Sequence, residues 1–305
     1  MVRRPQIITK YGMVLVNFIE GKRLPFSNTK SDIFLRIAPH QSDSLVNMKD
    51  TKKVVNVGKK EINVSCLCIG SSQKTTASLD VLMSKMMKEK ESLVWLDPTL
   101  LPTECLSCII CKWLDRTKAS DNIGLGIVIP RSDRVMSSKN DFKVWVSTPS
   151  GPLRKDLEEN HLPVWYPSLN REPRFLETIT SVVKPFDVFP LVEFPEAINY
   201  ISEREMAAHH SMLDHYRTRT RNLIYLNNRS PEEALKTLSE SFEAISRNGK
   251  MPRSLLVTPG GTSVSYLITL LAGVFSGGTF ITPEMETPFL GSKDMWGFAI
   301  FKKCE

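Results

Sequence analysis

The sequence predicts an α+β fold, in which a β-rich, jelly-roll or sandwich-like core is followed by a largely helical C-terminal region. Three observations support this prediction. Short apolar segments rich in β-branched and aromatic residues follow one another closely up to residue 195. Prolines recur between Pro130 and Pro195, where they disfavour long helices. Near Glu196 the apolar residues change to a helical spacing.

These patterns divide the chain into three predicted regions. Residues 1–60 form an N-terminal extension of strands and loops, residues 61–195 form the β-rich core domain, and residues 196–305 form the helical C-terminal region. Within the extension, the apolar segments 13–19 and 33–37 predict short strands between polar, turn-rich stretches.

The core domain is predicted to consist mainly of strands. Six segments have the β-branched and aromatic content of strands: 62–69, 92–96, 105–114, 123–129, 142–146 and 182–189. Only segment 78–90 carries a clear helical stripe of leucine and methionine. Short strands at this frequent spacing are typical of a sandwich or a jelly roll.

Two helices are predicted between residues 196 and 249. The first spans residues 202–227, with apolar residues at three- and four-residue steps and a capping box formed by Ser202 and Glu205. The second begins at Ser230, has Pro231 in its first turn and ends at Asn248-Gly249.

Residues 254–283 contain no charged side chain. The glycine pairs 260–261 and 277–278 interrupt this run, so its apolar part is short for a membrane span of roughly 20 residues. A buried helix between two strands is favoured over a membrane-associated segment. The turn before it, Pro259–Ser263, is expected to be a glycine-rich turn with a Thr or Ser helix cap rather than a phosphate-binding loop, because it lacks the lysine of a P-loop.

The charge of the chain favours a polyanionic partner. Its formal net charge is +7 and its sequence pI is about 9.0. Four arginines lie close together in the sequence, Arg217, Arg219, Arg221 and Arg229, and guanidinium groups bind phosphate well. On a helix Arg217 and Arg221 would align while Arg219 points away, so this run is either a nucleic-acid surface or a solvated helix face.

No cofactor or metal is expected, and the chain is predicted not to be an enzyme. Cys105, Cys108 and Cys111 lack a fourth ligand nearby and alternate with apolar residues, so they are predicted to be small buried hydrophobes. His210 and Asp214 would share a helix face, but two ligands do not make a metal site. The common dinucleotide, hydrolase and kinase motifs are absent.

One stretch resembles a known family. Trp95 and Pro98 are followed by the apolar segment 106–114 and then by Asp115-Arg116. This order resembles the core of the thirty-kilodalton superfamily of plant viral movement proteins, in which a hydrophobic strand ends in an aspartate. The resemblance implies a jelly-roll-like core and a structural role for Asp115 at a strand end.

The resemblance also implies a function. Such a protein would bind single-stranded RNA or a viral nucleocapsid and escort it through plasmodesmata. Its further partners would be host membrane or plasmodesmal proteins, and the formation of a homo-oligomer is an open alternative. The expected location is the host cytoplasm and cell junction, because the N-terminus lacks the pattern of a secretory signal. Two alternatives remain: a matrix-like protein that binds an anionic membrane, and an enzyme that uses Thr262 and Ser263 at a phosphate-binding turn.

Overall fold

A computed structural model of the chain divides into two compact units. The first unit comprises residues 1–132, 150–152 and 288–305, and the second comprises residues 133–149 and 153–287. Their borders differ from the predicted ones at residues 60 and 195. The structure describes residues 6–21, 33–37, 54–57, 93–97, 103–118, 124–130, 144–148, 151–152, 162–169, 171, 173–194, 207–216, 222–247, 253–283 and 295–302.

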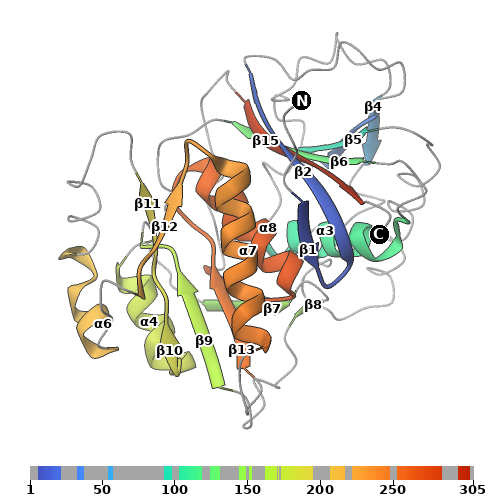
Figure 1. The fold of residues 1–305 in the computed structure, drawn as a ribbon. Helices are drawn as coiled ribbons and strands as arrows, with labels where there is room; N and C mark the ends of the chain where they lie inside the picture. The colour runs from blue at the N-terminus through green and yellow to red at the C-terminus, as the bar shows by residue number, and fades with distance from the viewer. Residues whose placement is uncertain are drawn as a thin grey trace. The chain divides into compact units, whose positions relative to one another are not determined.

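The first unit is built on a seven-stranded mixed sheet (Figure 1). The strands are neighbours in the order β1-β2-β15-β6-β5-β3-β4. Strands β6, β5, β3 and β4 pair in parallel, whereas β15 is antiparallel to both of its neighbours. The elements of this unit are β1 (Gln6–Thr9), β2 (Gly12–Gly21), β3 (Ile33–Ile37), β4 (Val54–Val57), β5 (Leu93–Asp97), α3 (Thr103–Arg116), β6 (Gly124–Pro130), β8 (Gly151–Pro152) and β15 (Met295–Lys302).

Helix α3 corrects the prediction of a strand at residues 105–114. The buried apolar side chains of this segment are Leu106, Ile109, Ile110, Trp113 and Leu114. They recur at steps of three, four, seven and eight residues from Leu106, which is the spacing of a helix face. The β-branched and cysteine content suggested a strand, but the spacing of the largest apolar residues determines the structure.

The second unit is built on a mainly parallel sheet. Its strands β10, β9, β13 and β14 pair in parallel in that order, and β7 pairs antiparallel with β14. The elements of this unit are β7 (Val144–Thr148), β9 (Leu162–Pro167), α4 (Pro173–Val183), β10 (Asp187–Val188), β11 (Leu191–Phe194), α6 (His210–His215), β12 (Ile224–Asn227), α7 (Pro231–Arg247), β13 (Arg253–Thr258), α8 (Ser263–Ser276) and β14 (Thr279–Pro283).

Strands β11 and β12 extend this arrangement. They pair in parallel with each other, and a parallel bridge from Ser168 to Leu191 joins β11 to the chain that leaves β9. In chain order the parallel strands are β9, β10 together with β11, β12, β13 and β14. In space β12 comes first, then β11, β9, β13 and β14, which is the order 3-2-1-4-5 of the first five strands of a doubly wound sheet. A jelly roll pairs its strands antiparallel. The predicted fold class of the whole chain stays a prediction, because residues 58–92 of the predicted core lie outside the described residues.

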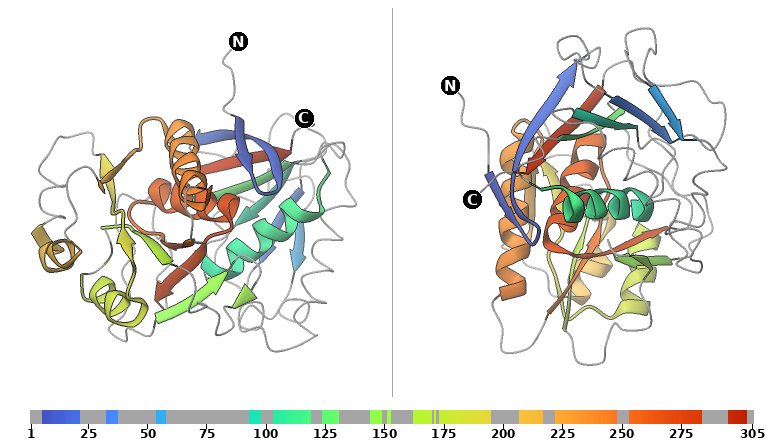
Figure 2. Two further views of the ribbon diagram at one scale, coloured as in Figure 1. Left: turned by 60° about the horizontal axis from the view of Figure 1, so that its bottom comes forward. Right: turned by 90° about the vertical axis from the view of Figure 1, so that its right-hand side faces the viewer.

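Helices cover both faces of this sheet. On one face Trp165, Val192, Leu256 and Ile281 share a buried apolar cluster with residues of α4 and with Met212 of α6. On the other face α7 and α8 lie side by side against β13 (Figure 2). Alternate side chains of each strand thus enter two different apolar layers.

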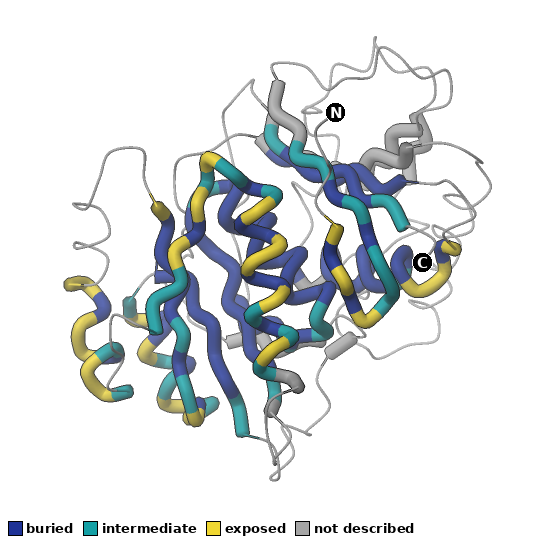
Figure 3. Tube along the Cα trace, viewed as in Figure 1, coloured by how far each residue is buried: buried dark blue, intermediate teal, exposed yellow. Residues whose placement is uncertain are grey.

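Helix α8 lies in the core of the second unit. Every residue from Ser263 to Phe275 is buried, whereas α7 has exposed residues along one side (Figure 3). This confirms the prediction of a buried helix between two strands, β13 and β14. Among the described helices, none is long and apolar enough to cross a membrane.

Several other elements were predicted correctly, and two were not. The strands at 13–19, 33–37, 92–96 and 123–129 are confirmed, and so is the helix that begins after Ser230. The predicted helix over 202–227 is wrong at its end, because residues 224–227 form β12. The predicted strand over 182–189 begins on the last turn of α4, a helix that Pro173 opens at its first position.

Candidate nucleic-acid interface

Among the described residues, those that the sequence singled out lie on different elements. Trp95 lies on strand β5 of the first unit, and Pro98 lies outside the described residues. Asp115 lies on the last turn of α3, and Arg229 lies in the turn between β12 and α7. The three remaining arginines of the predicted interface, Arg217, Arg219 and Arg221, lie outside the described residues.

Asp115 has a different setting from the predicted one. It was expected to end a buried strand, where a carboxylate must be paired or hydrogen-bonded. Instead it is exposed at the end of a helix, after the buried residues Trp113 and Leu114. The strand that would carry the resemblance to movement proteins is therefore a helix in this structure.

Several polar contacts of the second unit lie where its parallel strands end. Strands β9, β11, β12 and β13 run in the same direction. The loops that follow them therefore lie along the same edge of the sheet, the one formed by the carboxyl ends of the strands. The backbone N–H of Ser168, just after β9, donates to the carbonyl of Thr258 at the end of β13. In doubly wound sheets this edge is the usual place for a ligand.

The glycine-rich turn at this edge is closed by the protein's own carboxylate. The backbone N–H of Thr262 donates to Glu193 Oε1 at 2.6 Å, and Glu193 is only 8% exposed. Gly261 has a φ of +87°, and a Cβ there would overlap Glu193 Oε1. Glu193 thus supplies the anion that the N-terminus of α8 favours. Thr262 is the N-cap residue, but its side chain makes no capping hydrogen bond, so the expected Thr or Ser cap is replaced by Glu193.

Further side chains hold the same turn in place. Arg171, which is 4% exposed, donates from Nε to the carbonyl of Pro259 at 2.6 Å. Asn228 donates from Nδ2 to Thr262 Oγ1 at 3.3 Å and accepts from the Ser265 hydroxyl at 2.9 Å. A phosphate at this turn would have to displace Glu193, so the contacts favour a structural turn over the phosphate site of the enzyme alternative.

An exposed aromatic pair lies at the ends of β11 and β12. Phe194 and Tyr225 are each 49% exposed, and their rings meet edge to face with centroids 6.4 Å apart and an interplanar angle of 84°. Phe194 pairs with Asn227 and Val192 pairs with Tyr225, so all four side chains belong to one face of the strands. Val192 is buried, while the other three are exposed and leave the end of this face open to solvent. We call Phe194, Tyr225 and Asn227 the aromatic platform.

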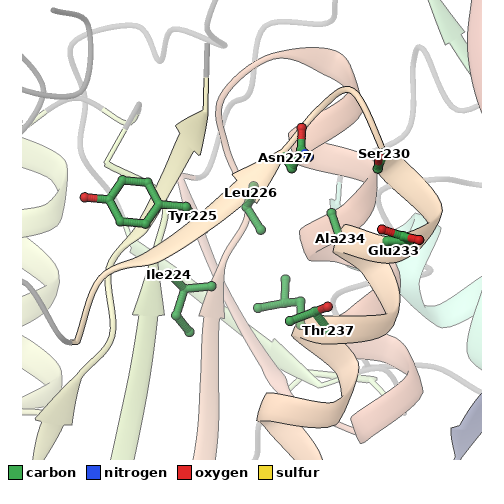
Figure 4. Close-up of a pocket in the computed structure, with 9 residues that line it drawn as sticks. Ile224, Tyr225, Leu226, Asn227, Ser230, Glu233, Ala234 and Thr237 are labelled. Atoms are coloured by element: carbon green, nitrogen blue, oxygen red, sulfur yellow. The ribbon is translucent and has the colours of Figure 1, made fainter. Parts of the chain in front are cut away.

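The platform adjoins a small cavity, and Tyr225 and Asn227 also contribute to the lining of that cavity. That cavity, of about 150 Å³, lies between β12 and α7 and is lined by residues such as Leu226, Ala234 and Thr237. Figure 4 shows Tyr225 directed away from α7, on the opposite side of β12 from Ala234 and Thr237. The ring of Tyr225 is thus presented outward rather than into the cavity.

An arginine follows the platform directly. The backbone N–H of Arg229 donates to Asn227 Oδ1 at 3.0 Å, a local turn that lets the chain leave β12 and enter α7. The Arg229 side chain is exposed. Exposed aromatic rings and arginines are the residue types that bind single-stranded nucleic acid, because rings stack on bases and guanidinium groups bind phosphate.

A second hollow, of about 650 Å³, lies between α4 and α6. Its lining is mixed in charge and includes Glu177, Lys184, His215 and Tyr216. Nearby, His209 is buried and its Nε2 lies 2.6 Å from the carbonyl oxygen of Leu169. Burial lowers the pKa of His209, although the hydrogen bond to Leu169 acts in the opposite direction.

Two cysteines of α3 have side chains that the structure describes, and both are buried. Cys108 and Cys111 are buried free thiols, and Cys111 Sγ lies 2.9 Å from the hydroxyl of Tyr11. Burial raises the pKa of Cys108 to about 11, so its thiol stays protonated at neutral pH. Within the described part of the chain, no three His, Cys, Asp or Glu side chains gather in the manner of a metal site.

Sequence reasoning missed the aromatic platform. Phe194 and Tyr225 are far apart in the chain, and each belongs to an apolar segment of the kind that is usually buried. Their exposure and contact depend on the pairing of β11 with β12, which the sequence pattern did not predict. One weak signal was present, since Tyr225 alternates with Ile224 and Leu226 in a way that places it on the other face of a strand.

Comparisons with known proteins add no functional information. No protein-family model matches the chain, and no curated protein matches it significantly. Similar solved structures include a protein provisionally assigned as a universal stress protein from Pseudomonas aeruginosa UCBPP-PA14, with 8% identity over 82% of this chain and 81% of that chain and a TM-score of 0.26. A functionally unknown protein from Pseudomonas aeruginosa PAO1 has 8% identity, coverage of 82% and 80%, and a TM-score of 0.25. Similarity at this level supports no inference about this chain.

Proposed function

We propose that this protein binds single-stranded nucleic acid, with the aromatic platform and Arg229 as the contact surface in the second unit. The observation that carries the proposal is the exposed pair Phe194 and Tyr225, held edge to face on two neighbouring strands. Arg229 follows strand β12 two residues later in the chain. A folded protein usually buries large aromatic rings, whereas proteins that bind single strands present them to stack on bases. The net charge of +7 favours the same class of partner.

The proposed contacts differ in what they contribute. Stacking of a base on Phe194 or Tyr225 is worth about 1 to 3 kcal/mol and tolerates every base. Arg229 would bind a phosphate, which adds affinity that falls with added salt but reads no sequence. The protein would therefore bind single strands without reading base edges, and its affinity would depend strongly on salt.

Fluorescence anisotropy with a labelled single-stranded RNA tests this function. Phe194→Ala and Tyr225→Ala should each weaken binding by about 5- to 150-fold, the equivalent of one lost stack. Phe186→Ala is the matched control, because Phe186 is also exposed, at 59%, but lies between α4 and β10 rather than on the platform. If all three variants bind as the original protein does, the platform is not a nucleic-acid surface.

A charge variant tests the phosphate contact separately. Arg229→Gln should reduce the slope of log affinity against log salt by about 0.7, the value for one phosphate contact on a single strand. Lys184→Gln removes an exposed positive charge at the end of α4 and serves as the control. An equal reduction in both variants would indicate a diffuse electrostatic effect without a contact at Arg229.

The wider role that we propose is transport of a viral genome or nucleocapsid between plant cells, as the resemblance implies. It rests on the binding surface and the charge, and not on Asp115, whose predicted strand is a helix. A fluorescent fusion in leaf epidermal cells tests it, with accumulation at plasmodesmata expected. Strong flotation with acidic liposomes in the absence of nucleic acid would instead favour the matrix-like alternative.

A further inference from the structure

We infer that the aromatic platform selects strands whose neighbouring bases are not stacked on one another, so that uridine-rich RNA binds in preference to adenine-rich RNA. This inference rests on the proposed function and adds a specificity that general single-strand binding does not require. The observation behind it is the angle between the two rings, 84° between the planes of Phe194 and Tyr225.

The ring angle limits how bases can stack on the platform. In a stacked strand the planes of neighbouring bases are nearly parallel. Two ring faces that are almost perpendicular cannot both take part in one continuous stack of that kind. If neighbouring bases stack on Phe194 and on Tyr225, their own planes must also turn apart, and the stack between them is broken.

The strand register accounts for this arrangement. Tyr225 is paired with Val192, so Phe194 lies two residues further along on the neighbouring strand and on the same face. Such diagonal neighbours are within reach of large aromatic side chains. At 6.4 Å the ring centroids have the separation of an edge-to-face pair, which the quadrupoles of the two rings favour. The angle therefore follows from the pairing of β11 with β12 and from the preferred contact of two rings.

Breaking the stack between bases costs least where that stack is weak. Adenine-rich strands stack strongly and are stiff, while uridine-rich strands stack weakly and are flexible. Preferences of this kind arise from stacking strength and backbone flexibility rather than from hydrogen bonds to base edges. A duplex is excluded more strongly, because its bases are both paired and stacked.

Binding of oligouridine and oligoadenosine dodecamers to the full chain tests the inference. The uridine strand should bind about tenfold tighter, which corresponds to about 1.4 kcal/mol. The ratio should stay constant as salt is raised, because both strands offer the same number of phosphates. Tyr225→Ala should reduce the ratio toward one, and Phe186→Ala should leave it unchanged. Tyr225→Leu repeats the test with a side chain that keeps the apolar volume but has no ring.

A spectroscopic measurement gives an independent result. The circular dichroism of the adenosine strand should lose the part of its stacking signal that comes from the bases on the platform when the strand is saturated with protein. Equal affinity for the two strands, or a bound adenosine strand that keeps its stacking signal, would overturn the inference even if Phe194→Ala and Tyr225→Ala both weaken binding. If those two variants bind RNA as tightly as the original protein, the proposed function itself fails instead.

Discussion

Replacement of Gly261 by alanine should destabilise the second unit far more than its size suggests. Gly261 adopts a φ of +87°, where an L-residue loses roughly 1 to 2 kcal/mol. In addition, its new Cβ would overlap Glu193 Oε1 and displace the carboxylate from the N–H of Thr262. A hydrogen bond to a charged group is worth about 1.5 to 3 kcal/mol, so the total loss should be about 3 to 5 kcal/mol.

A double-mutant cycle separates these two contributions. In a Glu193→Ala background the overlap no longer exists, so Gly261→Ala should cost only the backbone part, about 1 to 2 kcal/mol. Gly12→Ala provides a control for the backbone part alone, because Gly12 has a φ of +98° and no heavy atom lies within 4 Å of the position that a Cβ would take there. Gly12 lies in the first unit, so its effect must be measured on that unit's own transition.

Urea unfolding followed by hydrogen exchange of peptides from α8 and β13 is a suitable assay, because it reports the second unit separately. The expected result is a coupling energy of about 1.5 to 3 kcal/mol between positions 193 and 261. If Gly261→Ala costs the same amount with and without Glu193, the carboxylate does not hold the turn and the account of the closed α8 N-terminus is wrong.

Four further predictions concern other residues. Asp115→Ala should change the free energy of unfolding by less than about 0.5 kcal/mol, because Asp115 is exposed on α3; a larger loss in urea unfolding would restore a structural role. The unfolding free energy should fall as pH decreases below about 6.5, since burial lowers the pKa of His209 and the unfolded chain binds the proton first. His209→Gln should remove part of this decrease, by at most about 1.4 kcal/mol per pH unit, and an unchanged pH profile would argue against the buried neutral imidazole. Cys108 and Cys111 should react with Ellman's reagent slowly at pH 8 in the folded protein and rapidly in urea, because both thiols are buried; rapid reaction without denaturant would contradict their burial. Replacement of both Arg217 and Arg221 by Gln should reduce the salt slope of RNA binding by about 1.4 if both contact phosphate, and an unchanged slope would assign this run to a solvated surface.

The sequence predicted elements best where local signals agreed with the tertiary structure. Helix α7 has Pro231 at its first position and Glu232 and Glu233 in its first turn, and both features stabilise a helix N-terminus without help from the rest of the chain. Helix α8 was predicted from its uninterrupted apolar run between two glycine pairs, and it is buried as expected.

The errors have a common physical cause. In α3 and at β12, residue type and residue spacing favoured different structures, and the outcome depended on what each segment packs against. Ile224 to Asn227 continue a helical spacing in the sequence, yet they pair with β11, and the N–H of Ile224 donates to the carbonyl of Pro190. Pairing with a distant segment is not encoded in local periodicity, so neither β12 nor the platform that depends on it could be derived from the sequence alone.

The place of β15 in the first unit has a consequence for synthesis of the chain. This strand lies between β2 and β6 and pairs with both, although it follows the whole second unit along the sequence. While the ribosome is still translating the second unit, β2 and β6 have already emerged but lack the strand that joins them, and unpaired strand edges are prone to aggregate. All residues of the second unit precede residue 288, so this unit is complete in the nascent chain before β15 is translated. A nascent chain released before Met295 would therefore contain the complete second unit and a first unit whose sheet is split in two.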